Sequence, residues 1–148
     1  MAASTTYGVP ARGSVLALLG ALGALAIGGC GGSDDDASAQ RAGDETSVRR
    51  VLSDLQAAAV AGDGKQICAE IFTPKLATSV TTSATSGSCA KEVRRNLFSP
   101  TTKLTVQTVT VADAANATAK VKEASGKAST VFLVRQSGRW RIRSIQAA

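Results

Sequence analysis

The sequence predicts an α+β domain in which helices come first and an antiparallel meander of four strands follows. Two observations predict this class. Apolar residues recur at three- and four-residue steps up to about residue 98, and at every second residue from about residue 103 onward. Thr and Val dominate the second region, as is typical of strands joined by short turns. Helices followed by a run of strands are typical of the α+β class.

The first two helices are predicted from a hydrophobic stripe and a capping signal. Residues 44–61 form an amphipathic helix whose apolar face is Val48, Val51, Leu52, Leu55 and Ala59. Gly62 ends it, and Asp63 with Gln66 resembles a capping box for a second helix. This short helix carries Ile67, Cys68, Ile71 and Phe72.

Two further helices complete the first half. Thr73 followed by Pro74 predicts the start of a third helix, which continues through Leu76 and Val80. A polar loop follows at residues 81–88. Residues 89–97 are predicted to form the last helix, with Val93, Leu97 and Phe98 directed inward.

Four strands are predicted near residues 103–111, 117–123, 130–136 and 139–145. Leu104 and Val106 share one parity, whereas Val109 and Val111 share the other. This change predicts a β-bulge near residues 107–108.

The first thirty residues have the pattern of an export signal. Residues 15–27 form an uncharged apolar run of thirteen residues, too short for the roughly 20 that span a bilayer. Ile27-Gly28-Gly29-Cys30 then resembles the lipobox of bacterial lipoproteins. The resemblance implies that Cys30 carries a diacylglyceryl group on its sulfur, with fatty acids such as palmitate, and becomes the N-terminus. The alternatives are an ordinary secretory signal with an incidental cysteine, or an uncleaved membrane anchor.

This interpretation divides the chain into a signal peptide (residues 1–29), a flexible acidic tether (residues 30–44) and a folded domain (residues 45–148). The tether segment lacks large apolar residues after Cys30 and cannot bury enough surface to offset its ordering entropy. Its acidic residues are also compatible with a simple solvated linker. From residue 46 to the end, fifteen Lys and Arg face six acidic residues, so the domain is basic.

Cys68 and Cys89 form an even pair in a chain predicted to be exported, where disulfides persist. A bridge closing a loop of about twenty residues stabilises a small domain by on the order of 3 kcal/mol. Two buried free thiols are the alternative. A zinc site would need two more ligands, which this histidine-free chain does not supply, so no metal is predicted. No other cofactor is predicted either.

The chemical inventory disfavours catalysis. The chain has no histidine, and its only tyrosine, Tyr7, lies in the predicted signal peptide. A lone carboxylate such as Asp54, Asp63 or Glu70 remains as an alternative general base. Asp63 is also explained as a helix cap, and the other two as solvated helix faces. We therefore expect a protein that is not an enzyme.

Four arginines near the C-terminus form a candidate contact for anionic lipid or wall polymer: Arg135, Arg139, Arg141 and Arg143. The last three alternate with Trp140 and Ile142, so that a strand directs the arginines to one face and the apolar residues to the core. The alternative is that these charges keep an edge strand soluble. Nucleic acid is not an expected partner, because the basic domain carries very few aromatic residues.

Several segments together resemble the NTF2-like, or cystatin-like cone, superfamily. They are the helix ending Ala61-Gly62-Asp63, the short helix with Cys68, the Ser88-Cys89 segment and the hairpin at residues 131–142. The resemblance implies a strongly curved sheet with helices packed in its concavity and a conical pocket. That superfamily includes isomerases, dehydratases and cyclases as well as binding and accessory domains, so fold alone does not give function.

The expected function is that of a lipoprotein held at the outer face of the cell membrane by the lipid on Cys30, with a non-catalytic binding or accessory role. Its expected partner is an unknown envelope protein or small ligand. The alternatives are an NTF2-like pocket enzyme that uses a lone carboxylate base, and a module that docks electrostatically onto anionic lipid or wall polymer.

Overall fold

The computed structural model describes residues 33–85 and 87–148. Helices α1 (Ser33–Ala61), α2 (Gly64–Gln66), α3 (Pro74–Ser83) and α4 (Cys89–Glu92), with π-helical turns η1 (Ile67–Ile71) and η2 (Val93–Leu97), precede the strands. The strands are β1 (Leu104–Val111), β2 (Asn116–Glu123), β3 (Ala128–Gln136) and β4 (Arg139–Ala147). The α+β class and the predicted order of elements are confirmed.

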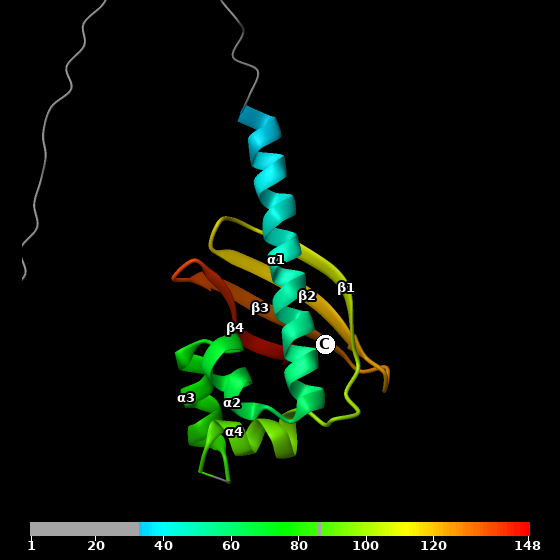
Figure 1. The fold of residues 1–148 in the computed structure, drawn as a ribbon. Coiled ribbons are helices and arrows are strands. Elements are labelled where there is room, and N and C mark those ends of the chain that lie inside the picture. The colour runs from blue at the N-terminus through cyan, green and yellow to red at the C-terminus, as the bar shows by residue number, and fades with distance from the viewer. Residues whose placement is uncertain (1–32, 86) are drawn as a thin grey trace, which may run out of the picture. The chain divides into compact units, whose positions relative to one another are not determined.

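The strands form one antiparallel sheet in the order β1-β2-β3-β4. The register shifts between Val106 and Thr108, which confirms the predicted bulge. A second shift, between Phe132 and Leu133, was not predicted. Figure 1 shows α1 crossing one face of the sheet, with α2, α3 and α4 gathered near the C-terminal end of α1.

The core lies between α1, η1 and the covered face of the sheet. Its largest fully buried side chains come from these elements, from Phe72 directly after η1 and from Val93 at the start of η2: Val48, Leu52, Leu55, Ile67, Phe72, Val93, Val131, Leu133 and Ile142. On β2 the buried residues include Ala117 and Ala119, which leave room for the larger side chains of α1. Apolar side chains therefore occupy the space between α1 and the sheet.

Helix α1 begins earlier than the sequence predicts. It starts at Ser33 and so includes residues 33–44, for which a flexible tether is predicted. Residues 35–43 are exposed, and in Figure 1 the first turns of α1 extend past the sheet. Once the buried part of a helix is nucleated, adding further residues is inexpensive. The Ala-rich composition and the acidic first turn, with Asp35 and Asp36, favour this extension.

Leu97 differs from the prediction as well. It is 49% exposed, whereas Val93 is fully buried. The chain from Val93 to Leu97 forms a π-helical turn rather than the α-helix used for the prediction. A π-helical turn holds more residues than an α-helical one, so Leu97 is rotated away from the core.

Local capping signals start the short helices as predicted. The Asp63 carboxylate accepts a hydrogen bond from the Gln66 backbone N–H at 2.9 Å, and the Thr73 hydroxyl accepts one from Leu76 at 3.2 Å. The Thr73 N–H also donates to the carbonyl of Ile142 at 2.9 Å, which attaches this segment to the edge of β4. Thr73 thus begins α3 with its hydroxyl and holds it against the sheet with its backbone N–H.

Two longer-range links hold the helices together and to β1. Cys68 and Cys89 form a disulfide between η1 and α4, with Cα atoms 6.2 Å apart, as the cysteine pair predicts. The Gln56 side chain on α1 donates to the Thr102 carbonyl and accepts from the Leu104 N–H at 2.6 Å. Gln56 therefore fixes the entry of the chain into β1.

Candidate functional site

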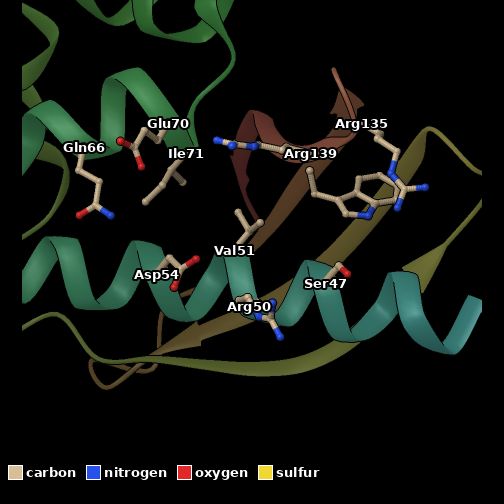
Figure 2. A pocket seen from close by; sticks show the side chains of 11 residues that line it. Ser47, Arg50, Val51, Asp54, Gln66, Glu70, Ile71, Arg135 and Arg139 are labelled. Carbon is tan, nitrogen blue, oxygen red and sulfur yellow. The ribbon is translucent and has the colours of Figure 1, made fainter. Parts of the chain in front are cut away.

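A cleft of about 350 Å³ lies between α1, the α2–η1 segment and the hairpin formed by β3 and β4. We call it the hairpin cleft, and Figure 2 shows it from close by. Its lining comes from all three segments: Ser47, Arg50, Val51 and Asp54; Gln66, Glu70 and Ile71; and Arg135, Gly138, Arg139 and Trp140. Segments distant in sequence therefore meet around one concave surface.

The α1 wall follows directly from helical spacing. Ser47, Arg50, Val51 and Asp54 are separated by three and four residues, so they lie along one side of the helix. Val51 is half-buried, whereas Arg50 and Asp54 are exposed. The wall is therefore polar at its rim and apolar toward the core.

The far end of the cleft is built by Arg135. Its Nη2 lies 2.6 Å from the Asp44 carboxylate, and its guanidinium carbon lies 5.2 Å from the centroid of the Trp140 ring. The Asp44 side chain is 4% exposed and that of Arg135 is 30% exposed. Arg135 is thus neutralised by a buried carboxylate and stacked on a buried aromatic ring.

Four other charged side chains lining the cleft have no such partner. Within residues 33–85 and 87–148, the side chains of Arg50, Asp54, Glu70 and Arg139 make no ion pair or hydrogen bond. All four are exposed. Figure 2 shows Arg139 extending from β4 toward Glu70, while Asp54 and Glu70 lie with Gln66 at the same end of the cleft.

The floor of the cleft is apolar. Ile71 and Trp140 are both 4% exposed. The indole Nε1 of Trp140 is buried and has no hydrogen-bond partner among the described residues. This donor belongs to a residue of the cleft floor, and buried polar groups ordinarily have partners.

The structure places the four predicted contact arginines in different surroundings. Arg135 lies opposite Trp140 in the β3–β4 ladder and is paired with Asp44. Arg141 donates to the carbonyls of Ala69 and Phe72 at 2.8 and 3.0 Å, at the end of η1. Arg139 lines the hairpin cleft, and Arg143 is exposed further along β4.

The three carboxylates weighed as general bases are all exposed. Asp63 is the N-cap of α2, whereas Asp54 and Glu70 line the hairpin cleft. General-base catalysis by a carboxylate requires an apolar enclosure and a nearby donor for the developing charge. None of the three lies in such an enclosure.

In the part of the chain that the structure describes, no three His, Cys, Asp or Glu side chains are grouped so that they could hold a metal ion. Nor is any helix there both long and apolar enough to cross a membrane. Cys30, the predicted lipidation site, lies outside the described residues.

Sequence reasoning did not find the hairpin cleft. The sequence suggests Asp54 and Glu70 as alternative general bases and Arg139 as a contact for an anionic surface, but not that the three line one cleft. The i, i+3, i+4 and i+7 spacing of Ser47, Arg50, Val51 and Asp54 was the one local signal for the α1 wall.

No family model matches the chain, and neither a curated protein nor a solved structure matches it.

Proposed function

We propose that the chain is a membrane-anchored envelope lipoprotein whose domain binds a small ligand in the hairpin cleft and catalyses no reaction on it. The observation that carries the binding role is that four exposed charged side chains without an ion pair or hydrogen bond are among the residues that line one cleft with an apolar floor. A concave site with an apolar base and few polar groups at its rim is the usual form of a ligand site.

The anchoring half of the proposal rests on the sequence. Ile27-Gly28-Gly29-Cys30 closes an apolar run of the length of a signal h-region. Lipid on Cys30 would leave only two residues before the start of α1 at Ser33. The domain would then be held at the outer face of the membrane by a short connection and a helix.

A non-catalytic role is favoured by the exposure of Asp54 and Glu70, the carboxylates that line the cleft. Both are better suited to bind a charged group than to remove a proton. We further propose that the domain is a small variant of the NTF2-like cone. An antiparallel sheet crossed by α1 on one face supports this, and the hairpin cleft is a concave site beside the apolar interior.

Docking onto anionic lipid or wall polymer is the weaker proposal. Of the four arginines considered, Arg135 and Arg141 are held by Asp44 and by two backbone carbonyls. Arg139 and Arg143 remain, and an exposed pair of cations attracts an anionic surface only modestly.

Trp140, the only tryptophan of the chain, provides a direct test. The mature lipoprotein in detergent is titrated with the dialysable fraction of an extract of the producing cells, and Trp140 emission is recorded. We expect a saturable change with the wild type and with Arg143→Gln, and a weaker one with Arg139→Gln. An equal response of all three proteins, or none, would contradict binding in the cleft. Consumption of a component by the wild type would contradict the non-catalytic role.

A further inference from the structure

We infer that the ligand of the hairpin cleft is a small zwitterion, with one ammonium and one carboxylate group, such as a free amino acid or a short peptide. The inference rests on the proposed binding role and adds the chemical class of the ligand. Three features carry it: the balance of unpaired charge, the placement of the two signs, and the apolar floor.

The unpaired charges of the cleft cancel. Arg135 is neutralised by Asp44 and contributes no free cation. What remains is two cations, Arg50 and Arg139, and two carboxylates, Asp54 and Glu70. A purely anionic ligand would meet the repulsion of both carboxylates, and a purely cationic ligand that of both arginines. A ligand carrying both charges satisfies the site.

The two signs are also placed where one ligand could bridge them. Asp54 and Glu70 lie together with Gln66, from α1 and the α2–η1 segment, and Arg139 enters from β4 and extends toward Glu70. An ammonium group suits the carboxylate end, because it donates three hydrogen bonds to oxygen acceptors. A carboxylate suits Arg139, because a guanidinium can bind both of its oxygens.

The floor adds a preference for an aliphatic side chain. Three apolar residues line the cleft together with the charged groups: Val51, which is half-buried, and Ile71 and Trp140, which are buried. The cleft volume of about 350 Å³ is at the small end of the range for ligand sites. We therefore use the dipeptide Leu-Leu as the probe.

The experiment compares Leu-Leu with two derivatives of the same shape, N-acetyl-Leu-Leu, which lacks the ammonium, and Leu-Leu-amide, which lacks the carboxylate. Binding to the mature lipoprotein in detergent is measured by calorimetry and by Trp140 emission. We expect each derivative to bind about tenfold or more weakly than Leu-Leu, as for loss of one charge-assisted contact.

Variants assign each charge to its partner. The Arg139→Gln variant should bind Leu-Leu and Leu-Leu-amide with similar affinity, because the partner of the ligand carboxylate has been removed. The double variant Asp54→Asn with Glu70→Gln should bind Leu-Leu and N-acetyl-Leu-Leu with similar affinity, because the partners of the ligand ammonium have been removed. Arg143→Gln, exposed on the same strand and outside the cleft, is the matched control and should bind as the wild type does.

Three results would overturn the inference, and they differ in what they mean for the binding role. If one derivative binds as tightly as Leu-Leu and still responds to Arg139→Gln, the cleft binds ligands but not as a zwitterion site. If Leu-Leu does not bind, while the dialysable cell fraction still changes Trp140 emission, the zwitterion class is wrong and the binding role stands. If that fraction also has no effect, both fail.

Discussion

The Asp44 carboxylate and the Arg135 guanidinium lie 2.6 Å apart, although 91 positions separate the two residues in the sequence. The pair joins α1 to β3 at the end of the hairpin cleft. It also removes one cation from the free charge of the cleft. A contact that fixes the fold therefore also sets the electrostatic character of the candidate site.

Asp44→Asn should destabilise the domain by about 1–3 kcal/mol, because Arg135 would lose its anionic partner while remaining largely shielded from water. The value lies below that of a fully buried pair, since the Arg135 side chain is 30% exposed. Urea unfolding at pH 7 measures the difference. Asp36→Asn, exposed on the same helix, is the control, and equal stability of the two variants would contradict a structural role for the pair.

Gly43→Ala should stabilise the domain by about 0.5–1 kcal/mol. Gly43 lies inside α1, and an added Cβ would meet nothing within 4 Å. The gain arises because alanine loses less backbone entropy than glycine on entering a helix. Thermal unfolding followed by circular dichroism checks it. An unchanged midpoint would indicate that residues around Gly43 form the flexible tether expected from the composition instead.

Replacing both Cys68 and Cys89 by alanine should cost about 3 kcal/mol or more. The bridge closes a loop with a sequence separation of 21, and Cys89 is buried in the core. Dithiothreitol should lower the unfolding midpoint of the wild type toward that of the variant. The variant itself should not respond to the reductant. A wild-type midpoint unaffected by complete reduction would contradict this account.

Asp113 should make the turn between β1 and β2 sensitive to pH. The Ala115 N–H, with the side chain and N–H of Asn116, hydrogen-bonds the carboxylate and holds the pKa of Asp113 below its usual value. A lowered folded-state pKa stabilises the fold above the ordinary aspartate pKa of about 3.9, and this contribution is lost as pH falls through the lowered value. Asp113→Asn should therefore be less stable than the wild type at pH 7, with the difference shrinking in acid. If the stability difference between the wild type and Asp113→Asn did not change with pH, the charge of the Asp113 carboxylate would not be its cause.

Local chemistry made much of the fold predictable. The caps at Asp63 and Thr73, the bulge near Thr108, and the burial of Trp140 and Ile142 all follow from neighbouring residues. The contacts that position the cleft do not. Nothing near Asp44 identifies Arg135 as its partner, and the alternation along β4 does not reveal that Arg141 binds the carbonyls at the end of η1.

The early start of α1 shows a similar limit. Composition alone favours an unstructured segment at residues 31–43, because no large apolar residue lies there. The helix extends through it because the buried stripe that includes Val48 and Leu52 has already supplied the nucleus. Only the packed part of α1 is encoded by hydrophobic spacing.

Anchoring to a membrane is the claim on which the proposed role depends, and the intact mass of the mature protein tests it most directly. The protein is extracted from the membranes of the producing cells alongside Cys30→Ala. The account predicts a wild-type chain that begins at Cys30 and carries acyl mass on that residue, and no acylated form of the variant. A mature wild-type chain without acyl mass, or one that keeps residues 1–29, would contradict it.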